Sequence, residues 1–140
     1  MSKPTFVYVT YIATTIEQLW EAITSESFAE QYWEEGQLQS DWQVGSPVEQ
    51  VNSEGESQTV GEVLQSEPPH QLSYTFQFFD HTQPSRVRFL LEPSEHQVKL
   101  TVIHDQLEAQ SYLSNSDRWA MCLSNLKRFL ELELMTVWVA

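Results

Sequence analysis

His104 is the residue of this 140-residue sequence best suited to acid–base or hydrogen-bonding chemistry. It ends the stretch VKLTVIH, in which Val98, Leu100 and Val102 alternate with other residues. This alternation places the four side chains on one face of a strand. The simpler interpretation is that His104 is structural and hydrogen-bonds to neighbouring protein groups. The alternative is that it faces a ligand pocket as a hydrogen-bond donor. Catalysis would need a partner, and Tyr74 is the best acid–base partner that the sequence offers.

Other kinds of chemistry lack their sequence signatures. The four histidines show no spacing typical of zinc ligands, and Cys122 is the single cysteine. Cys122 falls in an apolar helical stripe, so a small buried hydrophobe is favoured over a catalytic thiol. Nucleophile elbows, phosphate-binding loops and dinucleotide fingerprints do not occur. We therefore expect no catalytic residue, no metal site and no cofactor, and we favour a non-catalytic role over an enzymatic one.

Aromatic residues are numerous. Their side chains are suited to forming the walls of a binding site and not to reacting with a ligand. After the pair Pro68-Pro69, the residues Leu72, Tyr74, Phe76 and Phe78 recur at every second position. Strand alternation puts these four on one side but does not say which side. They either fill a core or line a cavity for an apolar small molecule. In the second case, Tyr74 and Trp119 have polar tips that could orient the ligand.

The elements that must position these residues follow from hydrophobic periodicity. Residues 5–12 read as a strand, and helical spacing then begins at Thr14, which has capping-box spacing with Glu17. A second short helix is expected over residues 28–33. Turn residues then separate a series of expected strands, which is typical of an antiparallel meander. The expected ranges are 40–43, 47–52, 58–66, 71–79, 86–92 and 97–105.

A long C-terminal helix over residues 117–135 completes the pattern, with an apolar stripe that contains Trp119, Cys122 and Leu126. These elements predict one α+β domain over residues 1–140, in which a curved antiparallel sheet of about six or seven strands covers the long helix. A gap between sheet and helix is a natural ligand cavity. Arg86 and Arg88 should face outward. A register shift of one residue would turn them inward, where they could bind an acidic ligand.

The charge balance excludes several classes of partner. Twenty acidic and seven basic residues give a net charge of −13, which repels nucleic-acid backbones and anionic lipid heads. The sequence has no apolar run near the ~20 residues that span a bilayer, and its first residues do not resemble a signal peptide. We therefore expect a cytoplasmic protein without nucleic-acid binding or membrane insertion.

Five motifs, spread over nearly the whole chain, resemble the START-like (Bet v 1-like) superfamily, and within it the AHSA1-like branch named after the activator of Hsp90 ATPase. They are IATTIEQLWEAIT, WEEGQLQSDWQVGSPV, GEVLQSEPPHQLSYTF, VRFLLEP with VKLTVIHDQL, and RWAMCLSNLKRFLE. The resemblance implies a helix-grip fold, in which the Pro-Pro turn separates two strands that line the cavity. The expected cavity-lining residues are Trp20, Trp33, Trp42, Leu72, Tyr74, Phe76, Phe89, Val102, His104, Trp119, Cys122 and Leu126.

Three functions are compatible with this fold, because fold alone does not define activity. Binding of a hydrophobic small molecule, such as a lipid, polyketide or aromatic metabolite, needs only a cavity with aromatic walls. A cyclase or hydrolase would need the His104–Tyr74 pair. A chaperone or protein-interaction module is the weakest expectation, because the eukaryotic activators of the family carry an additional N-terminal domain. A protein partner remains unknown, and we expect a monomer or a weak homodimer.

Overall fold

The computed structural model describes residues 5–24, 37–51, 54–77, 83–107 and 112–139. Within these ranges it describes all side chains except those at 37–38, 112–115 and 133–139. The expected second short helix, and with it Trp33, lies outside the described residues, and so does Phe78.

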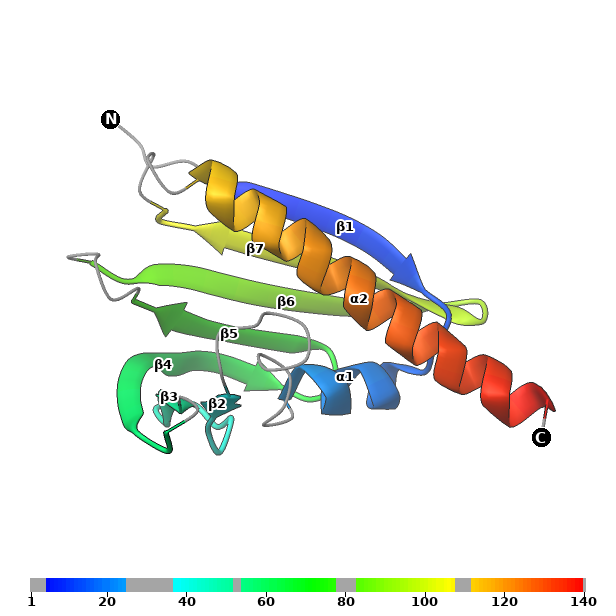
Figure 1. The fold of residues 1–140 in the computed structure, drawn as a ribbon, viewed down its shortest axis with the longest axis horizontal. Coiled ribbons are helices and arrows are strands. Elements are labelled where there is room, and N and C mark those ends of the chain that lie inside the picture. The colour runs from blue at the N-terminus through cyan, green and yellow to red at the C-terminus, as the bar shows by residue number, and fades with distance from the viewer. Residues whose placement is uncertain (1–4, 25–36, 52–53, 78–82, 108–111, 140) are drawn as a thin grey trace.

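Seven strands form one sheet in the order β1-β7-β6-β5-β4-β3-β2, and every neighbouring pair is antiparallel. Apart from the crossover that brings β1 beside β7, the sheet is a meander (Figure 1). The strands are β1 (Phe6–Ile12), β2 (Gln37–Gln39), β3 (Pro47–Val51), β4 (Ser57–Glu67), β5 (Gln71–Phe76), β6 (Ser85–Ser94) and β7 (Gln97–Asp105).

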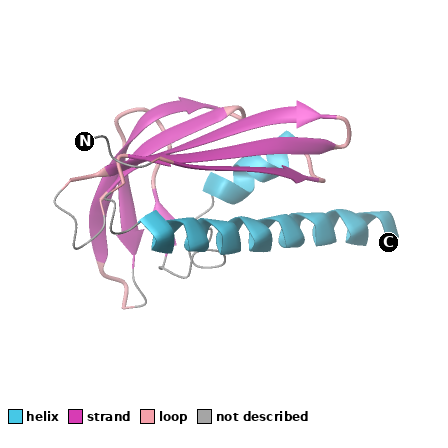
Figure 2. Cartoon of the chain, turned by 90° about the horizontal axis from the view of Figure 1, so that it is seen from above, coloured by secondary structure: helices cyan, strands magenta, loops and turns pink. Residues whose placement is uncertain are grey.

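Among the described residues, two helices, α1 (Ile16–Thr24) and α2 (Tyr112–Val139), accompany the sheet. Figure 2 shows both helices on the same side of the curved sheet, with the long α2 crossing it. This arrangement confirms the expected α+β architecture. Each helix turns an apolar stripe toward the sheet, namely Leu19 and Ile23 of α1 and the α2 positions Trp119, Cys122, Leu123, Leu126 and Leu130.

Strand alternation produces the matching face of the sheet. In β6, Val87, Phe89 and Leu91 are buried, and in β7 the buried set is Val98, Leu100, Val102 and His104. Facing side chains form rows across the strands, because the register pairs Leu72 with Phe89 and Phe89 with Val102. The intervening Arg86 and Arg88 are partly exposed on the opposite face, so the outward register expected for them is confirmed.

Three local expectations were wrong. Residues 40–43 do not form a strand. The strand instead covers Gln37–Gln39, because Trp42 (φ 55°) and Gly45 (φ 89°) adopt left-handed backbone conformations that interrupt pairing. The cap of α1 is Thr15, whose Oγ1 accepts a hydrogen bond from the Gln18 amide at 3.1 Å, and not Thr14. The long helix begins at Tyr112 and not near residue 117.

The last of these errors has an energetic explanation. The segment from residue 112 to 117 reads YLSNSD, and serine and asparagine read as capping or turn residues in a sequence. Their intrinsic cost inside a helix is at most ~0.7 kcal/mol per residue relative to alanine, so tertiary packing easily overrides it.

A charged pair fastens α2 to β1, which is an edge strand of the sheet. Lys127 donates from Nζ to the Tyr11 carbonyl oxygen at 2.6 Å, and Glu131 Oε2 accepts from the Ala13 amide at 3.0 Å. Lys127 and Glu131 also bond to each other at 2.7 Å. Two backbone groups at the end of the edge strand are thereby satisfied, which limits the strand's ability to pair with another chain.

Candidate ligand-binding site

An aromatic row crosses the inner face of the sheet. Trp42 contacts Tyr74, Tyr74 contacts Phe89, and Phe89 contacts Trp119, with ring centroids 5.5, 6.2 and 5.8 Å apart. The sheet supplies Tyr74 and Phe89 from β5 and β6, whereas Trp119 comes from α2. Offset and edge-on geometries of this kind stabilise aromatic pairs beyond their area burial. The row therefore links the sheet–helix interface to the partly buried Trp42.

His104 closes the inner end of this row through a buried hydrogen-bond chain. The Trp119 indole donates from Nε1 to His104 Nδ1 at 2.9 Å. The other ring nitrogen, Nε2, lies 2.7 Å from Ser85 Oγ, and Ser85 donates in turn to the Phe76 carbonyl oxygen at 2.8 Å. An indole N–H can only donate, so Nδ1 accepts and the proton of the neutral ring resides on Nε2. Both ring nitrogens thus have protein partners.

This arrangement does not support acid–base catalysis by His104 and Tyr74. The register places both residues opposite Val87, one on each side of it. Neighbouring strands lie about 4.8 Å apart, so the backbones of the two residues are separated by roughly 10 Å, and the partners of the His104 ring nitrogens are Trp119 and Ser85 and not Tyr74. The lone pair of Nδ1 is also occupied by Trp119. The geometry matches the structural interpretation of His104.

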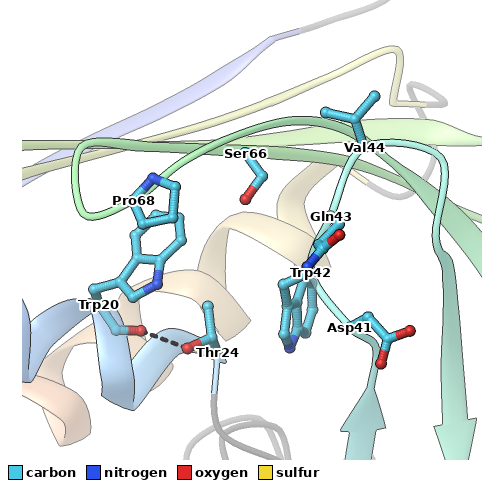
Figure 3. A pocket seen from close by; sticks show the side chains of 8 residues that line it. All are labelled: Trp20, Thr24, Asp41, Trp42, Gln43, Val44, Ser66 and Pro68. Carbon is cyan, nitrogen blue, oxygen red and sulfur yellow. Dashed lines mark hydrogen bonds between the residues drawn. The ribbon is translucent and has the colours of Figure 1, made fainter.

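The outer end of the row opens into a pocket of about 540 Å³. Figure 3 shows that it is framed by Trp20 from α1, by the loop between β2 and β3 that carries Trp42, and by the end of β4 with the adjoining turn. The lining residues are Trp20, Thr24, Asp41, Trp42, Gln43, Val44, Ser66 and Pro68. A volume of this size is within the range of small-molecule sites.

Local hydrogen bonds fix the backbone conformation on both sides of the pocket. Thr24 ends α1 and donates from Oγ1 to the Trp20 carbonyl oxygen at 2.8 Å, as Figure 3 shows. On the other side, the Trp42 amide donates to Ser40 Oγ at 3.0 Å. A side-chain acceptor two residues before a backbone donor is a common device for fixing a turn. It positions the Trp42 ring against Tyr74 despite the left-handed backbone.

The other expected site residues lie in the core. Leu72, Phe76, Val102, Cys122 and Leu126 are all buried. Burial raises the pKa of the Cys122 thiol to about 12, which is opposite to the requirement for a nucleophile. Burial, and secondarily the nearby Cys122, also raises the pKa of Tyr74 above its ordinary range. These groups remain neutral at physiological pH and present apolar or hydrogen-bonding surface.

Sequence reasoning missed several residues that the structure brings to this region. Ser85 completes the His104 chain, but a serine at the start of a strand carries no distinctive signal. The pocket residues Thr24, Asp41, Gln43, Val44, Ser66 and Pro68 come from three segments. Only the turn signals at Gly45 and at the Pro-Pro pair marked their neighbourhood.

A second polar cluster lies on the outer face of the sheet, away from the aromatic row. Arg86 and Arg88 both donate to the carboxylate of Asp105, through two nitrogens of Arg86 and one of Arg88. The Asp105 side chain is mostly buried, whereas those of both arginines are about two-fifths exposed. The cluster satisfies a carboxylate at the end of β7 and does not line the inner site.

Among the described residues, neither helix is long and apolar enough to cross a membrane. The part of the chain with described side chains also contains no group of three or more histidine, cysteine or acidic residues arranged to hold a metal ion.

Solved structures show the same fold. A protein from Cytophaga hutchinsonii is 23% identical with a TM-score of 0.76, and the match covers 96% of this chain and 99% of that chain. Protein MLL2253 from Mesorhizobium loti is 24% identical with a TM-score of 0.75, covering 91% and 97%. The Aha1 dimer from Colwellia psychrerythraea is 19% identical with a TM-score of 0.73, covering 91% and 96%. No curated protein matches this sequence.

A sequence comparison identifies the family directly. Residues 13–131 match the family described as activator of Hsp90 ATPase homolog 1-like protein. The matched range begins just before α1 and ends within α2, so it includes the aromatic row, the His104 chain and the pocket. The chain therefore belongs to the family of activator of Hsp90 ATPase homolog 1-like proteins.

Proposed function

We propose that this protein binds a hydrophobic small molecule, such as a lipid, polyketide or aromatic metabolite, and that it does so without catalysis. The ligand occupies the pocket between Trp20 and Trp42, against the outer end of the aromatic row. Of the cavity-lining residues expected from the sequence, Trp20 and Trp42 line this pocket, and the buried Tyr74 packs behind Trp42.

One observation carries this proposal: the pocket of about 540 Å³ has as one wall the outermost ring of a continuous aromatic row. Small-molecule sites combine apolar walls with polar groups that set orientation, and this pocket has both, with Trp20, Trp42 and Pro68 among its apolar members. Aromatic rings suit such a site because they offer large contact areas with few rotatable bonds. Members of this fold class commonly use the space between sheet and helix for hydrophobic ligands.

Binding without turnover is the simpler role because the buried polar groups are already used. His104, Trp119 and Ser85 hydrogen-bond to one another, and the Cys122 thiol is held neutral. An enzyme on this scaffold would have to break a satisfied buried network to free a base, and that carries a cost of about 1–3 kcal/mol for each polar group left unpaired.

The direct test uses N-phenyl-1-naphthylamine, a neutral fluorophore whose emission rises in apolar surroundings. We expect saturable binding with one site per chain. Trp42→Ala should weaken it at least tenfold, because the variant removes a pocket wall and the outer partner of Tyr74. Trp20→Ala is a second variant, on a different element, that should also weaken binding.

Tyr11→Ala is the matched control, because Tyr11 is an exposed aromatic residue on the outer face of β1. Thermal unfolding of each variant identifies any loss of fold. If the folded Trp42→Ala and Trp20→Ala proteins bind the fluorophore as the parent does, the pocket is not the binding site.

The oligomeric state remains a prediction of a monomer or a weak homodimer. The structural neighbour from Colwellia psychrerythraea is a dimer. In this chain, Val7, Val9 and Tyr11 expose about half of their surface on the outer face of β1, and this face is an apolar surface that a second copy could cover. Sedimentation velocity over a concentration series measures the state directly, and a tight dimer at micromolar concentration would contradict the prediction.

A further inference from the structure

We infer that the pocket between Trp20 and Trp42 selects a ligand with a positively charged head, an organic amine or quaternary ammonium group on an apolar or ring-containing body. This inference rests on the proposed function, because it names the ligand class of the same pocket. It goes beyond hydrophobicity by assigning a sign of charge to the ligand.

The charge on the pocket wall is the first observation. Among the described residues that line the pocket, Asp41 is the only ionisable side chain, and none is a lysine, arginine or histidine. Figure 3 shows Asp41 beside Trp42, on the side of that ring away from Trp20, and its side chain is exposed. A ligand cation near this carboxylate would be paired, whereas a ligand carboxylate would meet a like charge without a basic residue to offset it.

One neutral polar group, Thr24, suits the same sign, whereas Gln43, Ser66 and the two indole N–H groups can also donate. The Thr24 hydroxyl donates its hydrogen to the Trp20 carbonyl oxygen, so its remaining capacity toward the pocket is that of an acceptor. An ammonium group supplies donors and no acceptor, which complements this oxygen and the Asp41 carboxylate. A carboxylate ligand would instead require donors at these two positions.

The two indole rings are the third observation. Trp20 and Trp42 come from different elements and both line the pocket. Tryptophan offers the strongest cation–π attraction of the aromatic side chains, and the attraction persists at partly exposed sites. Both residues are half-buried, so each has ring surface available to an incoming group.

The field of the whole molecule reinforces this local preference. The net charge is −13, and of the basic residues with described side chains, Arg86, Arg88 and Lys99 lie on strands β6 and β7, and Arg118, Lys127 and Arg128 lie on α2. None of these six lines the pocket. A negative field concentrates cations at the surface and accelerates their capture, more strongly at low ionic strength.

The test is a displacement series against bound N-phenyl-1-naphthylamine with three competitors of matched shape. They are 2-naphthylmethylamine as the cation, 2-naphthalenemethanol as the neutral analogue and 2-naphthoate as the anion, all at pH 7 and low salt. We expect the cation to bind about tenfold more tightly than the neutral analogue, and the anion to bind most weakly. The advantage of the cation should shrink as salt rises to about 0.5 M.

Two charge-matched variants separate the local carboxylate from the overall field. Asp41→Asn removes one charge at the pocket and preserves the side-chain shape, and it should lower cation affinity about threefold while leaving the neutral analogue unchanged. Glu95→Gln removes one charge at the exposed turn between β6 and β7 and should change neither affinity. Trp42→Leu should lower cation affinity more than that of the neutral analogue.

The outcomes distinguish this inference from the proposed function. If the neutral fluorophore binds but the three competitors are equal, or the anion binds most tightly, the charge assignment is wrong and hydrophobic binding stands. Equal effects of Asp41→Asn and Glu95→Gln would overturn the role of Asp41. If the fluorophore does not bind at all, the proposed function fails and this inference fails with it.

Discussion

Replacing Trp119 with phenylalanine tests whether the chain from Trp119 through His104 to Ser85 holds α2 on the sheet. The substitution preserves an aromatic ring beside Phe89 but removes the indole N–H that donates to His104 Nδ1. His104 is almost fully buried, so its nitrogen would lose its partner with little access to water. The expected effect is a loss of stability and not a loss of fold.

The magnitude follows from two contributions. Leaving a buried acceptor unpaired costs about 1–3 kcal/mol. Deleting part of a buried ring adds about 1 kcal/mol, on the scale of ~0.8 kcal/mol per buried methylene group. The free energy of unfolding should therefore fall by about 3 kcal/mol. With a urea m-value of about 1.5–2 kcal/mol per M, the unfolding midpoint should drop by about 1.5–2 M.

Urea unfolding followed by circular dichroism measures this change, with Trp20→Phe as the matched control. Trp20 is half-buried, and the structure assigns its indole no hydrogen bond with a described residue, so its replacement should cost less than about 1 kcal/mol. A double-mutant cycle with His104→Phe should give a coupling energy of about 1–2 kcal/mol. Equal losses for the two tryptophan variants, together with zero coupling, would refute the reasoning.

Three further outcomes follow from single residues. Gly61→Ala should destabilise the sheet by about 3 kcal/mol or more, because the added Cβ would lie 1.7 Å from the Thr75 carbonyl oxygen, and a normal urea midpoint would contradict this packing. Burial acts to raise the pKa of Glu131, but the bonds from Lys127 and from the backbone outweigh it and hold the pKa below the ordinary 4.5. Ionised Glu131 therefore stabilises the fold above that pH, and the contribution is lost as pH falls through the lowered pKa. Glu131→Gln should accordingly flatten the acid limb of the stability profile, and an unchanged limb would show that the residue does not contribute. Cys122, with its pKa raised to about 12, should react with a thiol reagent at pH 8 only under unfolding conditions, and rapid labelling of the native protein would show that it is accessible.

The sequence was sufficient to predict the sheet because its signal is local. Val87, Phe89 and Leu91 alternate with arginines, and this alternation alone assigned the buried face that the structure confirms. Five of the six expected meander strands overlap strands of the structure, with errors mainly at their ends, whereas the strand expected at 40–43 does not form. Strand pairing then follows from short turns between consecutive strands. The helical stripe of α2 was equally readable from its spacing.

The site was less predictable because it depends on residues distant in sequence. The bond between Trp119 and His104 joins a helix to a strand, and Ser85 enters from a third element. No sequence periodicity predicts contacts of this kind between side chains on different elements. Trp42 was expected in a strand, but its left-handed backbone turns it into the wall of a pocket. A tryptophan in that conformation is uncommon, and propensity alone favours the strand.

The most direct test of the account is a titration of ¹⁵N-labelled protein with N-phenyl-1-naphthylamine, observed at the indole N–H resonances of its five tryptophans. Single substitutions assign each resonance. We predict saturable shifts at Trp20 and Trp42, and a smaller shift at Trp119, whose N–H remains bonded to His104. Resonances of Trp20 and Trp42 that stay fixed while the fluorophore binds would contradict the proposed site.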